Sequence, residues 1–304
     1  MPVYLGLEPQ YCDPAPGKSV AAIIPVPYDE TSTFHKGADK GPRALLEASQ
    51  QVELYDIETG TEMYRRGIAT LAPVVYVGPP ETLAELVDAR VEQVLDREQI
   101  PIVIGGEHSV SIGAINATVN HFRNLSVLQI DAHGDTRESY MGSTHNHACV
   151  MARARERCRI VQVGIRAIDA EELKGMDRAR VFFAHDIMRS EPGRAGPVRV
   201  RDNGAPKISA DWMDRVVDLL TDDVYVTIDL DGFDPSIIPA TGTPEPGGLD
   251  WYTVNELLRR VIAKRKVRAF DVVELLPLPG EHASPFIAAK LVYRILSMMF
   301  AARQ

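Results

Sequence analysis

Three short clusters of carboxylate and imidazole side chains come directly after apolar, β-branched runs of this sequence. The clusters are GGEHS at 105–109, DAHGD at 131–135 and DLDGFDP at 229–235, and each follows a run typical of a buried strand. In extended backbone, side chains two residues apart point to the same face, so the groups of one cluster can converge on one point. We therefore treat these side chains as candidate metal ligands: His108, Asp131, His133, Asp135, Asp229 and Asp231.

The candidate ligands are hard to explain as separate structural residues. A single Asp after a strand is usually a helix cap or a turn residue, and a single His such as His108 is more often a hydrogen-bonded packing residue. Asp229 and Asp231, however, flank Leu230 in a run that otherwise has the character of a buried strand. Two neighbouring buried carboxylates without cations are very costly. The constellation as a whole therefore indicates a cation site.

The number and type of these side chains indicate two ions rather than one. Four carboxylates and two imidazoles exceed what a single divalent ion needs, and they suit two ions that share bridging carboxylates. Oxygen and nitrogen ligands without thiolate favour two Mn²⁺ per chain, with Zn²⁺, Co²⁺ or Ni²⁺ as alternatives. Water between two such ions can lose a proton near neutral pH, so the sequence predicts metal-assisted hydrolysis by a bridging hydroxide.

Alternating strands and helices must position these clusters. The apolar runs expected to form strands are 20–26, 74–77, 102–104, 126–130, 160–163, 181–183, 224–228 and 267–273. Helical periodicity is clearest over 81–97, 212–220 and 254–263, and the apolar helical stretch 287–299 is expected to pack on the sheet. This alternation is typical of a parallel sheet covered by helices on both faces, which binds ligands beyond the carboxyl ends of its strands. All three clusters stand at such ends.

Composition and charge narrow the class of protein. The 304 residues are 45% apolar, and we expect a single domain over 1–304 with an irregular surface insertion at 186–207. The net charge of −9 argues against nucleic acid or an anionic membrane as the partner. Three scattered cysteines, no recognisable signal peptide and no apolar run approaching membrane-spanning length indicate a cytoplasmic protein.

The three clusters, in the same order, resemble those of the ureohydrolase (arginase and agmatinase) family. The resemblance covers nearly the whole chain and is greatest to the agmatinases, through PVPYDETSTFHKGADKGPRALLEAS near the N-terminus, TGTPEPGG at 241–248, DVVELLP at 271–277 and IAAKLVYRIL at 287–296. The family fold is a three-layer α/β/α sandwich with a mainly parallel sheet of about eight strands, and its members are usually trimers or hexamers. The resemblance implies this fold and a homo-oligomer of this kind.

The resemblance also implies how the ligands divide between two ions. Carried over position by position, the first ion takes His108, Asp131, Asp135 and Asp229. The second takes Asp131, His133, Asp229 and Asp231, so that Asp131 and Asp229 bridge the two. Thr227 stands where the family often has Ser, and we expect little effect from this difference.

Three catalytic residues follow from the same resemblance. Glu274, in DVVELLP, is expected to bind the substrate guanidinium, whose planar donors suit a carboxylate; the alternative is a surface or capping Glu. His147, in NHACVM, looks like the proton-shuttling His of the family that contacts the substrate and protonates its leaving amine, although nearby His145 competes for that role. Asp135 can relay a proton beside the bridging hydroxide.

The expected substrate depends on the loop at 138–146, ESYMGSTHN. Arginases carry there a Ser- and Asn-rich pattern that holds the α-carboxylate and α-amine of arginine, and this loop lacks it. We therefore expect a small cationic guanidino substrate, agmatine, hydrolysed to putrescine and urea. Glu138 could meet the distal ammonium of agmatine, or it is an exposed loop charge.

Other substrates and other reactions remain as alternatives. Within the family they are 4-guanidinobutyrate, 3-guanidinopropionate, aminopropylagmatine and arginine. A metal-dependent deacetylase of a related fold is less consistent with the sequence, because such enzymes use fewer ligands and a tandem His pair that is not found here. A non-catalytic relative is also disfavoured, since such relatives commonly lose ligands and all six are present.

Overall fold

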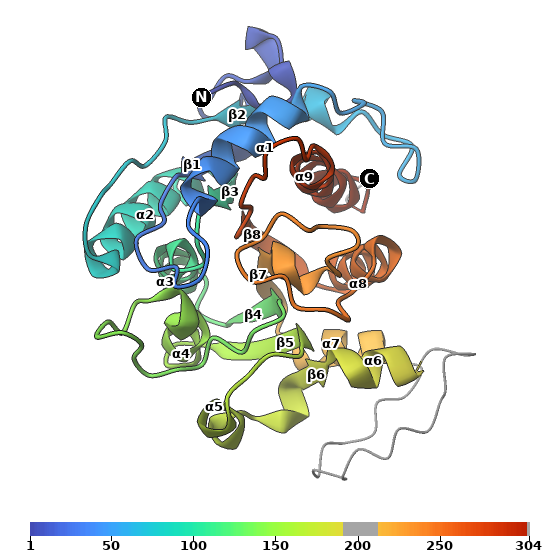
Figure 1. Cartoon of the computed structure of the whole chain (residues 1–304). Coiled ribbons are helices and arrows are strands. Elements are labelled where there is room, and N and C mark those ends of the chain that lie inside the picture. The colour runs from blue at the N-terminus through green and yellow to red at the C-terminus, as the bar shows by residue number, and fades with distance from the viewer. Residues whose placement is uncertain (191–211, 303–304) are drawn as a thin grey trace.

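A central sheet of eight parallel strands organises the chain (Figure 1). The computed structural model describes residues 1–190 and 212–302. The strands of these residues are β1 (Ala21–Val26), β2 (Ile68–Thr70), β3 (Ile100–Gly105), β4 (Leu125–Ile130), β5 (Arg159–Ile165), β6 (Val181–Phe183), β7 (Asp223–Asp229) and β8 (Lys266–Val273). Their order in the sheet is β2-β1-β3-β8-β7-β4-β5-β6, and every neighbouring pair is parallel. The carboxyl ends of all eight strands therefore meet at one edge.

Helices cover both faces of the sheet. In the described residues they are α1 (Gly41–Ser49), α2 (Pro80–Leu95), α3 (Val110–His121), α4 (Val150–Arg155), α5 (Ala170–Gly175), α6 (Ala184–Ser190), α7 (Trp212–Leu219), α8 (Trp251–Lys264) and α9 (Ala283–Ala301). Buried side chains of α1, α7, α8 and α9 pack on one face, and those of α2, α3 and α4 pack on the other. This three-layer sandwich confirms the fold class predicted from the sequence.

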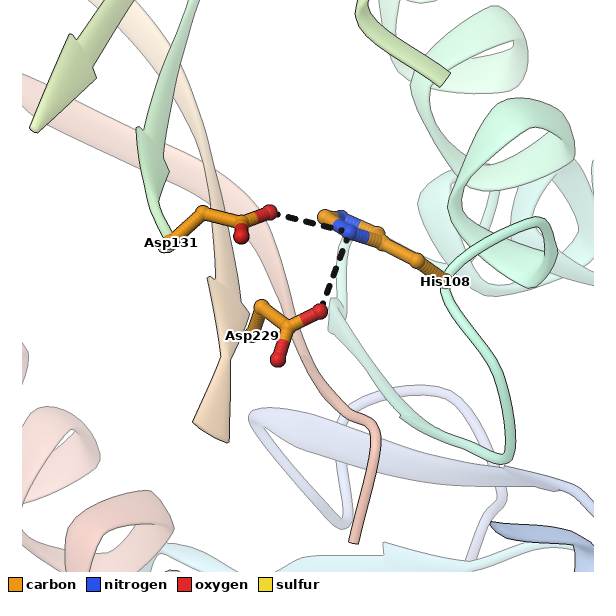
Figure 2. A group of neighbouring side chains, drawn as sticks. All are labelled: His108, Asp131 and Asp229. Atoms are coloured by element: carbon orange, nitrogen blue, oxygen red, sulfur yellow. Dashed lines mark ion pairs between the residues drawn. The ribbon is translucent and has the colours of Figure 1, made fainter. Parts of the chain in front are cut away.

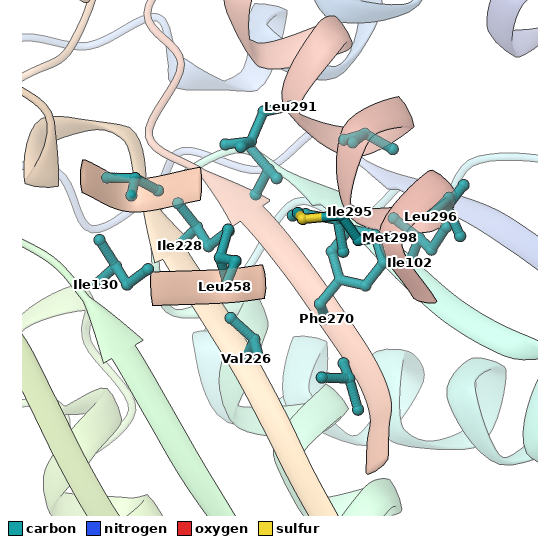
Figure 3. Packing of buried hydrophobic residues seen from close by; sticks show 14 of the residues in the cluster. Ile102, Ile130, Val226, Ile228, Leu258, Phe270, Leu291, Ile295, Leu296 and Met298 are labelled. Atoms are coloured by element: carbon teal, nitrogen blue, oxygen red, sulfur yellow. The ribbon is translucent and has the colours of Figure 1, made fainter. Parts of the chain in front are cut away.

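The alternation of side chains along each strand fills both interfaces. In β3, Ile102 and Ile104 belong to the core on the α9 side, whereas Val103 belongs to the core on the α2 and α3 side. On the α9 side, Phe270 of β8 lies near Ile295 (Figure 3). Because both faces are buried, apolar residues are needed at successive positions, and this explains the continuous apolar runs in the sequence.

One predicted strand is wrong and one strand was missed. The run at 74–77 has no regular secondary structure, and Val75 and Val77 are 70% and 80% exposed. The segment still contacts strand β1, because the backbone N–H of Val74 donates to the carbonyl of Pro25. The edge strand is instead β2, which has three residues and no run of β-branched side chains to reveal it. The other seven runs match strands of the structure within a few residues.

Two further expectations need correction. Helix α9 is long and apolar enough by composition to cross a membrane, whereas the sequence analysis found no apolar run of such length. However, 78% of the apolar stretch of this helix is buried inside the protein. It packs on the sheet and on α1 and α8, as a core helix does. Of the insertion expected to be irregular at 186–207, residues 186–190 belong to helix α6, and residues from 191 onward lie outside the described part of the chain.

Candidate metal centre and active site

The candidate residues meet at the carboxyl ends of four adjacent strands in the middle of the sheet. His108 follows β3, Glu274 follows β8, Asp229 ends β7 and Asp131 follows β4. Together with neighbouring loops, these strand ends enclose a pocket of about 400 Å³. The fold therefore brings together side chains that are far apart in the sequence.

The first group of ligand-type atoms surrounds one ring nitrogen of His108 (Figure 2). The Nδ1 atom of His108 lies 3.2 Å from Oδ2 of Asp131, 2.9 Å from Oδ2 of Asp135 and 3.4 Å from Oδ2 of Asp229. All four side chains are buried or nearly so. The imidazole enters from one side and the carboxylates from the other, as Figure 2 shows for Asp131 and Asp229.

The hydrogen bonds of His108 show which nitrogen is free to bind an ion. Nε2 lies 2.9 Å from the hydroxyl of Thr227, and that hydroxyl donates to Oδ1 of Asp271 at 2.7 Å. Because the Thr227 proton is used on Asp271, Nε2 must carry the ring proton and Nδ1 presents a lone pair. Buried Nδ1 has no hydrogen-bond partner, although three carboxylate oxygens face it. A cation among these four groups removes the conflict, so this donor set fits a divalent metal ion.

The electrostatics of the group lead to the same conclusion. Burial on its own lowers the pKa of His108, but the adjacent carboxylates of Asp131, Asp135 and Asp229 raise it well above its ordinary value. Burial, followed by the charges of Asp231 and Asp131, raises the pKa of Asp229 well above the usual range of an aspartate. These buried side chains therefore favour added positive charge, which a proton or a metal ion can supply.

A second group of ligand-type atoms shares one residue with the first. The Nδ1 atom of His133 lies 3.0 Å from Oδ2 of Asp231 and 3.7 Å from Oδ1 of Asp131. Asp131 thus directs one oxygen to each group, and a metal ion could be held by either set. Asp231 is fixed by the backbone N–H of Ala132, which donates to its other oxygen at 3.0 Å. The structure therefore brings together all six side chains that the sequence singled out as ligands.

Two of the functional carboxylates stand on unusual backbone. Asp135 has φ = 51° and Glu274 has φ = 63°, in the left-handed region that residues with a Cβ rarely adopt. Neighbouring backbone contacts hold both residues there. The carbonyl of Asp135 accepts from the N–H groups of Met151 and Ala152, and the N–H of Glu274 donates to the carbonyl of Gly106 at 2.8 Å. These contacts turn both side chains into the pocket.

Glu274 is poised to take a cation. Its Oε1 accepts the backbone N–H of His108 at 2.7 Å, and its Oε2 lies near Gly242, where a Cβ would approach within 3.9 Å. Burial, followed by the charge of Glu107, raises the pKa of Glu274 to about 8. A guanidinium beside this carboxylate would supply the charge that burial has removed.

His147 lines the pocket and is held by a carboxylate that the sequence analysis missed. Buried Glu107 lies 3.6 Å from Nδ1 of His147, and the hydroxyl of Thr31 lies 3.1 Å from the same nitrogen. Burial lowers the pKa of His147, but the nearby carboxylates of Glu107, Glu274 and Asp135 raise it on balance. The sequence signal for Glu107 was its place beside His108 in GGEHS.

The competing histidine points elsewhere. His145 contacts Thr144 and lies 3.9 Å from Glu81 of α2, and it is not among the described residues that line the pocket. Of the two histidines, the geometry therefore places only His147 where it can meet a bound substrate.

The outer part of the pocket contains three charged side chains that the sequence analysis did not identify. Arg137 lies 2.9 Å from Asp169 and 3.2 Å from Glu172, and its guanidinium stacks over the ring of Tyr140 at 4.7 Å. All four residues line the pocket. Two carboxylates thus face one guanidinium, and this end of the pocket carries net negative charge.

Glu138, which the sequence analysis considered for the same end of the pocket, has a different position. It is an exposed loop residue that pairs with Arg153 at 2.7 Å and with Arg155, and it does not line the pocket. The suggestion that it meets a distal ammonium is therefore wrong. The nearby carboxylates of Asp169 and Glu172 have the position that Glu138 was expected to have.

Comparisons with known proteins agree with this geometry. The N(1)-aminopropylagmatine ureohydrolase of Synechocystis sp. is 37% identical, over 91% of this chain and 88% of its own length. The agmatinase of Pyrococcus horikoshii is 29% identical, over 91% of this chain and 90% of its own. The crystal structure of the agmatine ureohydrolase of Thermoplasma volcanium superposes with a TM-score of 0.80 at 29% identity, over 96% and 93% of the two chains. The family described as Arginase family matches residues 19–298. The chain belongs to the arginase family.

Proposed function

We propose that this protein hydrolyses a guanidino compound to urea and an amine, and that the substrate carries a positive charge at its other end. The proposal rests on membership of the arginase family, on the two groups of ligand-type side chains, and on the partly buried carboxylate of Glu274 beside them. The charge of the outer part of the pocket selects the substrate, because two carboxylates, Asp169 and Glu172, face one guanidinium, that of Arg137.

Two divalent ions fit the donor set, and we propose Mn²⁺ because the donors are oxygen and imidazole nitrogen without thiolate. His108, Asp131, Asp135 and Asp229 would hold one ion. Asp131, His133 and Asp231 would hold the other, and we propose from the family resemblance that Asp229 bridges to this second ion as well. When bound, such a pair polarises the substrate and activates water as a nucleophile near neutral pH.

The side chains of the pocket bind and orient the substrate. Glu274 accepts two N–H donors of the guanidinium through the oxygen that the backbone of His108 leaves free, which fixes the guanidino carbon over the ligand groups. Gly242 leaves room at this carboxylate because it has no side chain. The raised pKa of Glu274 indicates how strongly this position favours a cation.

His147 supplies the proton that the leaving amine needs. Its ring lines the pocket, and Thr31 and Glu107 orient it through Nδ1, which leaves Nε2 free to point at the substrate. The raised pKa favours the protonated form of this ring, which is the form that a general acid requires. Asp135, with one oxygen on the first ligand group, can pass a proton towards the amine.

Agmatine is the first substrate that these features favour. We expect kcat/KM for agmatine to exceed that for arginine by at least about a hundredfold, because desolvating an unpaired carboxylate costs several kcal/mol and each 1.4 kcal/mol is about tenfold. The α-carboxylate of arginine would meet Asp169 and Glu172, and Arg137, the cation that the described residues place beside them, is already paired with both. Urea release from each substrate, with Mn²⁺ supplied, measures the ratio.

The variant Asp169→Asn tests whether the negative charge at the outer end of the pocket sets this substrate preference. Asp169→Asn should raise KM for agmatine and reduce the preference over arginine, because it removes one of the two negative charges at the outer end. Asp177→Asn, which alters an exposed carboxylate paired with Arg180, should leave both values unchanged. Comparable kcat/KM for agmatine and arginine in the wild-type protein would contradict the proposed substrate class and leave the hydrolysis of guanidino compounds standing.

N(1)-aminopropylagmatine is a second candidate, for a specific reason. The relative that is 37% identical has this compound in its name, and the outer pocket offers two carboxylates to a substrate tail that carries further ammonium groups. Kinetics with agmatine and N(1)-aminopropylagmatine side by side decide between the two. A kcat/KM at least about tenfold higher for the longer substrate would reassign the preferred substrate within the same class.

The number of metal ions is a separate expected result. We predict that fully loaded, active protein contains two divalent ions per chain, about 3.5 Å apart, as in other two-metal hydrolytic sites. Two sets of ligand-type atoms that share Asp131 support this number. Metal analysis together with the magnetic coupling of two Mn²⁺ in electron paramagnetic resonance measures it, and a single ion in fully active protein would contradict it.

The assembly, the partners and the cellular location stay predictions. We propose a homo-oligomer, a trimer or hexamer, which light scattering of the purified protein can test. We also propose that residues 1–304 form a single domain, and that the protein is a cytoplasmic enzyme that acts on a small cationic guanidino compound rather than on nucleic acid or membrane.

A further inference from the structure

Two glutamines are buried behind the candidate metal centre, in strands that are mostly apolar. Gln129 of β4 and Gln162 of β5 are 0% and 2% exposed, and they are neighbours in the register of the two strands. The other polar residues of these strands, Ser126 and Arg159, lie at their amino ends, away from the candidate metal centre. A buried amide without hydrogen bonds destabilises a fold, and an apolar pair would pack here at no such cost. Two buried amides at these positions therefore indicate a specific role.

The hydrogen bonds of the pair run in one direction, towards a candidate ligand. Nε2 of Gln162 donates to Oε1 of Gln129 at 2.6 Å and to the carbonyl of Gly134 at 2.8 Å. Because Oε1 of Gln129 accepts this bond, its Nε2 must face the other way, where it donates to Oδ2 of Asp131 at 2.7 Å. The same Nε2 lies 3.3 Å from the carbonyl of His133.

These hydrogen bonds end at the carboxylate of Asp131, which both ligand groups share. Oδ2 of Asp131 faces Nδ1 of His108 at 3.2 Å, and Oδ1 accepts the backbone N–H of His133 at 2.6 Å. A carboxylate oxygen has two lone pairs, so the bond from Gln129 leaves one of them for an ion. An amide donor fixes the carboxylate without neutralising it, whereas Lys or Arg at this position would compete with the metal for the charge.

We propose that Gln129 and Gln162 are positioning residues that hold Asp131 and the turn at 131–134 in the geometry that binds two metal ions. The two amides act on the ions only through Asp131 and through the carbonyls of His133 and Gly134. The proposal rests on the metal centre of the proposed function. It adds two residues, which are not themselves ligands, to the six ligands of that centre.

The test is a calorimetric Mn²⁺ titration of metal-stripped wild-type protein and of the variants Gln129→Met and Gln162→Met. Methionine keeps the length of the side chain and removes its hydrogen bonds. We expect each variant to lose about 10- to 100-fold in affinity for at least one ion, the range found for partners that hold a metal ligand in place. The double variant should lose little more than Gln129→Met, because both residues act along one chain of hydrogen bonds.

Gln99 offers a matched control. It is also a buried amide, 3% exposed, and it donates to the carbonyl of Ser19 at 2.9 Å, just before β3 and at the end of that strand away from His108. Gln99→Met should lose thermal stability as the other variants do, and should bind Mn²⁺ like the wild-type protein. Excess Mn²⁺ should restore urea release by Gln129→Met, because its catalytic side chains are intact.

The outcomes separate this proposal from the proposed function. If the wild-type protein binds two ions and folded Gln129→Met binds them equally well, the role of the glutamine pair is overturned and the metal centre stands. An equal loss of affinity in Gln99→Met would also overturn it, since the effect would then be a general loss of stability. A wild-type protein that binds no Mn²⁺ would overturn the metal centre and the role of the pair together.

Discussion

Asp231→Asn should lose one metal ion per chain and at least about a thousandfold in kcat, because a two-metal clamp supplies several kcal/mol and each 1.4 kcal/mol is about tenfold. The substitution keeps the shape of the side chain, and one oxygen can still accept the N–H of Ala132. The other oxygen, which faces His133 at 3.0 Å, is the candidate ligand. Metal analysis and urea release, measured on the same preparation, report the two losses.

The loss should be specific to this carboxylate. His133→Asn should behave in the same way, because its ring belongs to the same ligand group. Asp222→Asn is the matched control, since Asp222 is an exposed aspartate that pairs only loosely with Arg265 at 3.5 Å. Both ligand variants should unfold near the temperature of the wild-type protein in the presence of chelator. Wild-type activity and metal content in either ligand variant would show that the assignment of the second group is wrong.

His147→Ala should lower kcat by about 10²- to 10⁴-fold, the range typical of a general acid or base, and leave two ions bound. His147 lines the pocket between Thr31 and Tyr140, whereas His145 contacts Thr144 and Glu81 outside it. His145→Ala is therefore the matched control, and it should keep kcat within a few-fold of the wild-type value. A larger loss in His145→Ala would reverse the choice between the two histidines.

The pH dependence of kcat tests the part played by Glu107. If protonated His147 is the active form, kcat falls as pH rises through the pKa of that ring. Burial lowers this pKa, and the nearby carboxylate of Glu107 raises it. Glu107→Gln removes the charge, so the decline in kcat should move to lower pH. An unchanged profile would show that the essential group lies elsewhere.

The sequence predicted the ligands better than it predicted their surroundings. In a parallel sheet the carboxyl ends of all strands meet at one edge, so clusters such as DAHGD can be placed without knowing the strand order. That order was not predictable, because β8 and β7 are inserted between β3 and β4 after both of these strands are complete. Although these two strands separate β3 from β4, Nδ1 of His108 lies 3.2 Å from Oδ2 of Asp131 at the carboxyl edge of the sheet.

The residues that were missed depend on contacts between distant loops. Glu107 meets His147 through the segment around Thr31, which is more than 70 residues away in the sequence. Arg137 meets Asp169 and Glu172 only because the loop after β4 lies against α5. No periodicity encodes such pairs, since each partner alone resembles an exposed loop charge. The same ambiguity made Glu138 a candidate when its partners are arginines of α4.

The glutamine pair was visible in the sequence as a polar residue in each of two apolar runs, LSVLQI and RIVQVGI. A lone amide in a strand has several explanations, and one sequence cannot choose among them. The parallel register of β4 and β5 aligns Gln129 with Gln162, and only then does a chain of donors towards Asp131 exist.

The left-handed backbone conformation of Asp135 and Glu274 has a consequence for the evolution of this protein. A non-glycine residue held at this geometry costs about 1–3 kcal/mol, a large fraction of the stability of an ordinary domain. Glycine would relieve the strain at both positions and remove a carboxyl group from the pocket. In a lineage that no longer needed the reaction, mutation would therefore favour Gly at 135 and 274. We therefore expect acidic residues at both positions in relatives that retain the reaction, and their loss in relatives that do not.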